Sequence, residues 1–147
     1  MSIGSAAIAL ALASLSGSPT IAAEFTVRML SVDSEGRAMQ FEPAFLKIAP
    51  GDTITFAAAE MHDSDSLANG IPEGADGWRG GIDEELSVTF TAEGFYAFKC
   101  TPHFFDGMVG LIQVGDKPGN AAAIAALEMP GKARGRMDEL LAAATGD

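Results

Sequence analysis

Residues 99–108 read Lys99-Cys100-Thr101-Pro102-His103-Phe104-Phe105-Asp106-Gly107-Met108. This segment contains the only cysteine of the chain, one of its two histidines and a methionine, in the spacing Cys-x2-His-x4-Met. A thiolate, an imidazole and a weak thioether are donors of the mononuclear copper sites of electron carriers, where two histidines and one cysteine lie in a plane with a distant axial methionine. The segment supplies three of these four donors, and the second histidine can only be His62.

Each of these residues also has an ordinary structural explanation. A lone cysteine is most often a small buried hydrophobic residue, and a lone methionine usually fills space in a core. The combination is harder to explain in this way, because four donors of matching softness occur with no cysteine left over. A structural zinc site is disfavoured, since a thioether is an unusual zinc ligand. Four protein ligands leave no open position on the metal, which argues against an enzyme.

Length and charge narrow the class of protein. The 147 residues predict one domain with a sizeable core. The formal charge of -11 argues against nucleic-acid binding, which needs basic surface to neutralise phosphates. An acidic protein is instead steered toward a partner with a basic docking patch. With a single cysteine no intramolecular disulfide can form, so the thiol is free to bind a metal.

The N-terminal segment has the pattern of an export signal. Residues 1–23 carry no charged side chain and contain an apolar run over 6–15, followed by small residues that end at Ala22-Ala23. The run is too short to span a bilayer, so 1–23 is predicted to be a signal peptide and 24–147 the mature domain. No lysine or arginine precedes the apolar run, which makes the signal atypical, and an N-terminal helix of the folded protein is the alternative.

The mature chain begins with short strands divided by turns. A long segment over 59–81, rich in glycine, aspartate and serine, is predicted to be a loop that contains His62. Several strands at this spacing predict an all-β fold, a sandwich or barrel. Strands are expected at residues 25–30, 39–43, 45–48, 53–56, 87–91, 95–98 and 109–114.

The C-terminal part changes to a helical pattern. Asn120 is expected to be the N-cap of a helix over 121–129, which Pro130-Gly131 would end. A second helix is predicted over 132–145, since its apolar residues recur at helical spacing. Both helices are expected to pack on the sandwich.

With these segments placed, residues 24–147 resemble the pseudoazurins, which are type 1 (blue) copper proteins of the cupredoxin family. The resemblance implies an all-β, cupredoxin-like Greek-key sandwich of about eight strands, with the two C-terminal α-helices that shorter relatives lack. The matching pieces are Phe41-Glu42-Pro43, Ala49-Pro50-Gly51-Asp52-Thr53-Ile54-Thr55-Phe56, Ile71-Pro72-Glu73-Gly74, Val88-Thr89-Phe90-Thr91, Lys99-Cys100-Thr101-Pro102-His103, Gly107-Met108-Val109-Gly110 and Val114-Gly115-Asp116.

The resemblance further implies one type 1 copper held by His62, Cys100, His103 and Met108. It implies a monomeric periplasmic electron carrier without a membrane partner. Such a carrier takes electrons from a donor such as a cytochrome and passes them to a periplasmic redox enzyme, commonly copper nitrite reductase. The residues alone indicate only a soft-metal site, so a periplasmic copper chaperone or storage protein with the same ligands is the alternative. The lack of a methionine-rich cluster argues against that alternative.

Four residues are expected around the ligands: Met39, Asp63, Pro102 and Asp106. Met39 matches a methionine near the exposed histidine of the pseudoazurins. Asp63 stands where they carry an asparagine whose amide ties the two ligand loops together, and an ionised carboxylate can accept but cannot donate. We therefore expect Asp63 to weaken the tie or to lower the reduction potential. Asp106 is expected to favour the imidazolium form of His103.

The docking surface also departs from the resemblance. Pseudoazurins surround a hydrophobic face with lysines, of which Lys99 and Arg79 have counterparts here, whereas Val32 and Glu60-Met61 replace others. The sequence thus predicts an apolar docking patch and a partner that is less acidic than usual, or basic. The patch is expected to comprise His103, Phe104, Phe105 and Met108.

Overall fold

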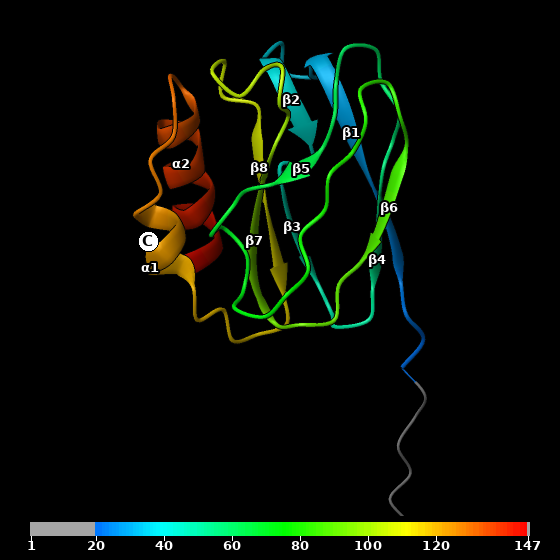
Figure 1. Ribbon diagram of the computed structural model, residues 1–147, viewed down its shortest axis with the longest axis vertical. Coiled ribbons are helices and arrows are strands. Elements are labelled where there is room, and N and C mark those ends of the chain that lie inside the picture. Colours follow the sequence, from blue (N-terminus) through cyan, green and yellow to red (C-terminus); the bar gives the residue numbers. More distant parts are fainter. Residues whose placement is uncertain (1–19, 147) are drawn as a thin grey trace, which may run out of the picture.

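Eight strands form two four-stranded sheets that pack face to face (Figure 1). The computed structural model describes residues 20–146. One sheet has the strand order β2-β1-β4-β6 and the other β3-β8-β7-β5. The strands are β1 (Glu24–Val32), β2 (Ala38–Glu42), β3 (Phe45–Ile48), β4 (Thr53–Phe56), β5 (Asp65–Ser66), β6 (Leu86–Thr89), β7 (Gly94–Lys99) and β8 (Val109–Val114).

Two parallel pairs join strands that are distant in the chain. β1 lies beside β4 and β3 beside β8, whereas all other pairs are antiparallel. This alternation of local hairpins with long connections is the Greek-key arrangement, so the predicted all-β sandwich is confirmed. β2 is an edge strand, as Pro43 after it requires.

The core lies between the sheets and is rich in aromatic side chains. The ring of Phe98 on β7 lies 4.6 Å from that of Phe41 and 5.3 Å from that of Phe56, both edge-on. Trp78 stacks on Phe56 with 5.7 Å between ring centroids. Cys100 belongs to the same cluster, so the metal-binding end of the protein is continuous with its core.

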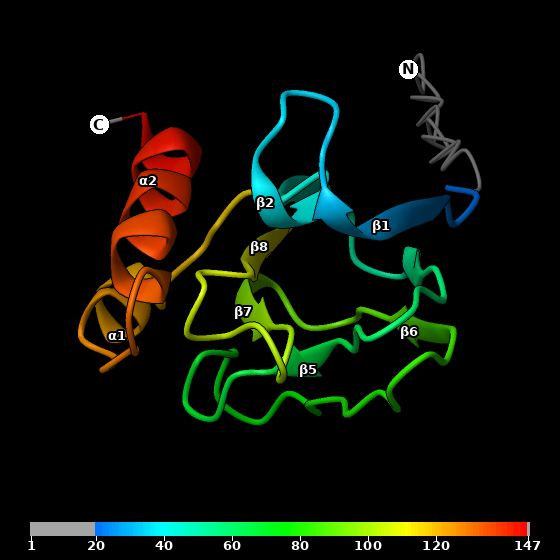
Figure 2. The same cartoon turned by 90° about the horizontal axis from the view of Figure 1, so that it is seen from above.

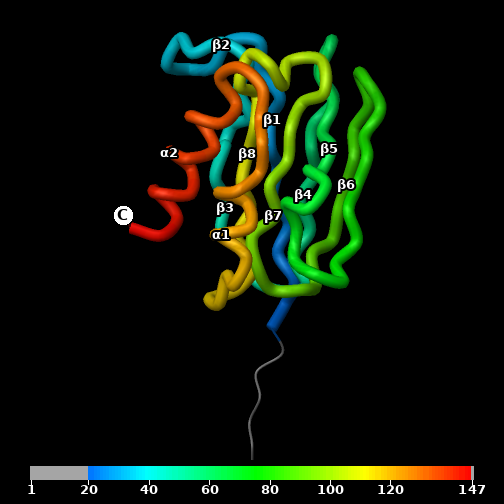
Figure 3. The backbone as a smooth tube through the Cα atoms, turned by 60° about the vertical axis from the view of Figure 1, so that its left-hand side comes forward, coloured from blue at the N-terminus to red at the C-terminus, as the bar shows by residue number. Residues whose placement is uncertain are grey.

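Helices α1 (Ala121–Ala125) and α2 (Ala133–Thr145) cover the outer face of the β7 and β8 sheet, as Figures 1 and 3 show. Phe95 and Leu111 point to the helices and pack with Ile124 and Met137. β8 is therefore buried along its whole length, which explains why its sequence is almost continuously apolar. The prediction that both helices pack on the sandwich is confirmed.

Helix α1 begins after Asn120, as predicted, but the role of the Asn120 side chain and the end of the helix differ from the prediction. The side chain of Asn120 makes no cap hydrogen bond; instead it accepts the N–H of Phe95 and donates to its carbonyl oxygen, both at 2.8 Å. The helix ends at Ala125 instead of residue 129. Arg134 on α2 donates to the carbonyl oxygens of Ile124 and Leu127, which supplies a side-chain donor where the chain leaves the helix.

The predicted loop over 59–81 is more ordered than its composition indicated. It contains β5, which pairs with β7 through Asp65 and Ser66. The hydroxyl group of Ser66 accepts the N–H of Trp78 at 3.0 Å, and Trp78 in turn enters the core. The composition was misleading because the segment is held by long-range contacts, which also give His62 a fixed position.

The predicted signal peptide covers 1–23, and 1–19 lie outside the described residues. Within residues 20–146, neither helix has the length and apolar character needed to cross a membrane.

Candidate metal centre

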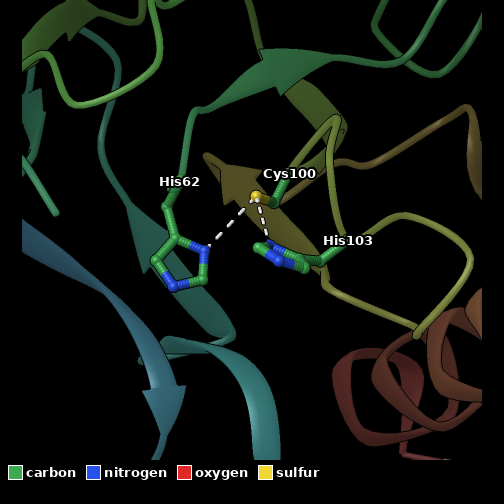
Figure 4. A group of neighbouring side chains, drawn as sticks. All are labelled: His62, Cys100 and His103. Carbon is green, nitrogen blue, oxygen red and sulfur yellow. Dashed lines mark hydrogen bonds between the residues drawn. The ribbon is translucent and has the colours of Figure 1, made fainter. Parts of the chain in front are cut away.

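Three of the predicted ligands lie together at one end of the sandwich (Figure 4). His62 comes from the segment between β4 and β5, Cys100 follows β7 directly, and His103 lies in the next turn. The Nδ1 atoms of His62 and His103 are 3.5 and 3.6 Å from the Sγ atom of Cys100. The three donor atoms all lie within 4.8 Å of one another.

The spacing of these donors suits a first-row metal ion. Bonds of about 2.0 Å to nitrogen and about 2.3 Å to sulfur, meeting near the tetrahedral angle, separate the two donor atoms by about 3.5 Å. The observed sulfur–nitrogen distances have this value. Two imidazoles with one thiolate are the in-plane donors of blue copper centres, so the residues present fit copper.

Met108, the fourth predicted ligand, is fully buried in the same core cluster as Cys100. The N–H of Cys100 donates to the carbonyl oxygen of Met108 at 2.9 Å, and the N–H of Met108 donates to that of His103 at 3.1 Å. These two bonds close the ligand loop, residues 100–108, on itself. The backbone of this loop therefore fixes the positions of Cys100, His103 and Met108 relative to one another.

Burial sets the protonation of the metal-free site. It raises the pKa of the Cys100 thiol to about 11, although the backbone N–H groups of Asp63 and His103 oppose the rise. Burial, followed by the charge of His103, lowers the pKa of His62. The lone pair of a neutral His62 is thus available to a metal ion, which must displace the proton of Cys100 as it binds.

The two histidines differ in exposure. The side chain of His62 is 1% exposed, whereas His103 is only half-buried. Phe105, two residues further along the loop, is 70% exposed. His103 therefore forms the route from the site to the surface.

Ser31 at the end of β1 was missed by the sequence analysis. Its hydroxyl oxygen lies 3.1 Å from Nε2 of His62, on the side of the ring away from Cys100. A hydrogen bond there leaves the lone pair on Nδ1, which is the nitrogen that faces the thiol. Ser31 has no local signal because it lies 31 residues before His62 in the chain.

Exchange of Ser31 for alanine should weaken metal binding roughly tenfold or more, because the partner that orients His62 is lost. Competition with a copper chelator measures the change. Ser34→Ala is the matched control, since Ser34 follows three residues later in the β1–β2 connection and donates to Glu42. Equal affinities of the two variants would contradict the role of Ser31.

Asp63 joins the two ligand loops by accepting a hydrogen bond. Its side chain is 5% exposed, and Oδ1 accepts the N–H of Thr101 at 2.5 Å. The hydroxyl group of Thr101 also donates to Asp65 at 3.2 Å. The tie between His62 and Cys100 thus uses carboxylates as acceptors, and it places a negative charge beside the residue that follows Cys100.

Asp63→Asn should raise the reduction potential of the bound copper by on the order of 50 mV, because a nearby negative charge favours Cu(II) over Cu(I). The amide oxygen can keep the bond from Thr101, so the fold should be unchanged. Voltammetry at fixed pH measures the shift. An unchanged potential would show that the carboxylate has no electrostatic effect on the site.

The other residues that were expected around the ligands are Asp106, Met39 and Pro102. Within residues 20–146 no ion pair joins Asp106 to His103; the exposed Asp106 instead borders a depression with Met39 and three basic residues. No direct contact in this part of the chain therefore supports the expectation that Asp106 stabilises the imidazolium form of His103. Met39 packs against the core cluster, and Pro102 is exposed between Cys100 and His103. The basic residues are Arg37, Lys132 and Arg136.

Comparison with known proteins agrees with the donor set. Residues 28–115 match the sequence profile of the copper binding proteins of the plastocyanin/azurin family. A pseudoazurin from Paracoccus pantotrophus is 46% identical over 138 residues, which cover 93% of this chain and 94% of that protein. The chain belongs to the pseudoazurin family.

Solved structures of pseudoazurins share this fold. One from Sinorhizobium superposes with a TM-score of 0.80 and 41% identity, covering 83% of this chain and 96% of the other. One from Methylobacterium extorquens AM1 gives a TM-score of 0.77 and 36% identity, with 82% and 98% coverage. Pseudoazurins are copper-binding electron carriers and not enzymes, so copper is the cofactor of this chain.

Proposed function

We propose that this protein is a periplasmic electron carrier in which His62, Cys100, His103 and Met108 hold one type 1 copper. We further propose that it is exported by the signal peptide over 1–23 and acts as a monomer. It takes electrons from a donor such as a cytochrome and delivers them to a periplasmic reductase such as copper nitrite reductase. The observation that carries the assignment of the ligands is the spacing of 3.5 and 3.6 Å between the thiol and the two imidazoles.

The chain's own residues account for rapid transfer. Bound copper supplies a one-electron couple between Cu(I) and Cu(II). Ser31 orients His62, Asp63 ties Thr101 to the other ligand loop, and the backbone bonds of residues 100–108 restrain the remaining donors. Donors restrained in this way move little when the charge on the site changes. The half-buried His103 provides the exit toward a partner.

The first experiment is a titration of the purified mature protein with one equivalent of Cu(II). An intense thiolate-to-copper band that disappears on reduction and returns on oxidation would support the carrier role. Tight binding of Cu(I) without this band or a reversible couple would overturn it in favour of a copper chaperone or store.

Several exposed hydrophobic residues stand close in the chain to the predicted ligands or to residues bonded to them. Four exposed hydrophobic side chains, which we call the apolar rim, adjoin the ligands in space or in sequence: Val32, Met61, Ile82 and Phe105. Val32 follows Ser31, Met61 precedes His62, and Ile82 precedes Asp83, whose N–H donates to the carbonyl oxygen of His62. Met108 is not on this surface because it is fully buried, so its predicted place in the docking patch is wrong.

Each of the two basic residues expected at the docking surface makes a contact within the protein. Lys99 lies with its Nζ atom 5.2 Å from the ring centre of the half-buried Phe104, and Arg79 is 3.9 Å from a carboxylate oxygen of Asp65. The positive charge of Arg79 is thus partly compensated. We propose that Phe104, Phe105, Lys99 and Arg79 contribute to docking, but that contact with the apolar rim is the main attraction. The partner should therefore present an apolar face without a strong negative charge.

Phe105→Glu should slow electron transfer to such a reductase about tenfold or more, because large aromatic side chains often dominate the energy of an interface. The potential and spectrum should stay unchanged. Thr91→Glu, exposed in the turn between β6 and β7 at the opposite end, adds the same charge and should have no effect. A fast reaction with an acidic reductase that slows as salt rises would contradict the apolar docking.

A further inference from the structure

Arg136 on α2 connects three parts of the protein through one nitrogen. Its Nη1 atom donates to the carbonyl oxygen of Met39 at 3.1 Å and to that of Gly107 at 2.9 Å. Met39 lies at the start of β2 and Gly107 in the ligand loop. The side chain is partly buried, and within residues 20–146 no carboxylate forms an ion pair with it. In this part of the chain the guanidinium group of Arg136 therefore bonds to backbone oxygens and not to an acidic side chain.

The peptide group that Arg136 contacts is next to a predicted ligand. The carbonyl oxygen of Gly107 accepts from Arg136, and the N–H of Met108, on the same peptide group, donates to the carbonyl oxygen of His103. One peptide group is therefore held on both sides, by α2 and by the His103 backbone. The orientation of this peptide group sets the position of the Met108 Cα atom, from which the side chain extends.

The beginning of α2 also packs closely on the ligand loop. The N–H of Lys132 donates to the carbonyl oxygen of Phe105 at 3.1 Å. A Cβ atom on Gly107 would lie 3.0 Å from Cβ of Lys132, and one on Gly131 would collide with the Phe105 carbonyl oxygen. Figures 1 and 3 show the start of α2 at the same end of the molecule as this loop, and Figure 2 shows it from above.

We propose that Arg136 is a positioning residue of the copper site, through which α2 fixes the Gly107–Met108 peptide and hence the Met108 and His103 ligands. The inference rests on the proposed ligand set. Burial, followed by the charge of Arg37, lowers the pKa of Arg136, although the charges of Glu139 and Asp33 oppose this change. A partly buried cation is tolerated when hydrogen bonds satisfy its donors, and the two bonds of Arg136 go to the start of β2 and to the ligand loop.

The test compares two arginines on the same helix. Arg136→Met removes the donors but keeps an unbranched apolar side chain, and Arg136→Lys keeps the charge and can donate again. Arg134→Met is the matched control, because Arg134 also donates to two backbone oxygens, which lie near α1, although it forms an ion pair with Asp138 as well. Both methionine variants should unfold at lower temperature, since each removes two hydrogen bonds to backbone oxygens.

Only Arg136→Met should change the copper site. We expect copper release to a chelator to become at least about tenfold faster, with a shifted reduction potential and a changed ratio of the thiolate-to-copper bands. Arg136→Lys should restore part of each property. A wild-type release rate, potential and spectrum in Arg136→Met would overturn the proposal, as would equal changes in Arg134→Met.

A measurement on the metal-free protein separates this proposal from the proposed function. Amide exchange at Met108 should accelerate about tenfold in Arg136→Met and not in Arg134→Met, because the peptide group loses the donor from α2 and keeps only its bonds to the backbone of His103 and Val109. Unchanged exchange would contradict the positioning role even if copper binds. Faster exchange in a protein without a reversible copper couple would instead show that Arg136 positions this peptide group although the proposed function is wrong.

Discussion

The Cys100→Ser variant should fold, lose the intense visible absorption and bind copper at least about a thousandfold more weakly, which corresponds to about 4 kcal/mol. The thiolate is the soft donor between the two imidazoles, and its Sγ atom is the common neighbour of both nitrogens. A serine hydroxyl is close to the thiol in size but does not ionise in the accessible pH range, so the copper–thiolate transition disappears.

The same variant tests whether copper binding releases the proton of the Cys100 thiol. Because burial raises the pKa of Cys100 to about 11, the thiol of the metal-free protein is protonated at pH 8. Uptake of copper should then release one proton, and affinity should fall about tenfold for each pH unit below that pKa. Cys100→Ser should lose this proton release. Calorimetry in buffers of different ionisation enthalpy measures it.

The fold of the variant is the control for this experiment. The circular dichroism of metal-free Cys100→Ser should match that of the wild type, which shows that the fold survives. A variant that keeps both the visible band and the proton release would mean that Cys100 is a buried core residue and that the metal site lies elsewhere.

Gly110→Ala should be the most destabilising single-methyl addition in the sandwich, lowering the free energy of unfolding by about 3 kcal/mol. Gly110 on β8 is paired directly with Phe98 on β7. A Cβ atom at residue 110 would overlap the Phe98 ring, which lies against the glycine backbone. The ring cannot move away easily, because Phe41 and Phe56 contact it.

Thermal unfolding of the metal-free protein measures this effect, with an expected decrease of about 10 °C. Gly119→Ala is the control, since no atom lies within 4 Å of a Cβ built there. The double variant with Phe98→Leu should recover part of the loss relative to the sum of the single changes. Strict additivity would show that contact with the Phe98 ring is not the cause.

The ligand loop could be predicted from sequence because its chemistry is local. Cys100, His103 and Met108 lie within nine consecutive residues, and the count of histidines leaves His62 alone as the fourth donor. The turn residues and alternating apolar residues predicted seven of the strands for the same reason, since the period of a strand is a short-range property. Only β5, two residues long inside a polar segment, had too little pattern to predict.

The surroundings of the site depended on tertiary structure. Ser31 meets His62 because β1 carries it to the same end of the sandwich, and Arg136 reaches the ligand loop from a helix 29 residues further along the chain. Asn120 has the right position for a helix cap, but its side chain instead forms hydrogen bonds with the backbone of Phe95. A polar side chain binds whichever backbone group the packing brings within reach. The sequence by itself therefore determined which atoms can bind copper, and only the packing of strands and helices decided which groups hold those atoms in place.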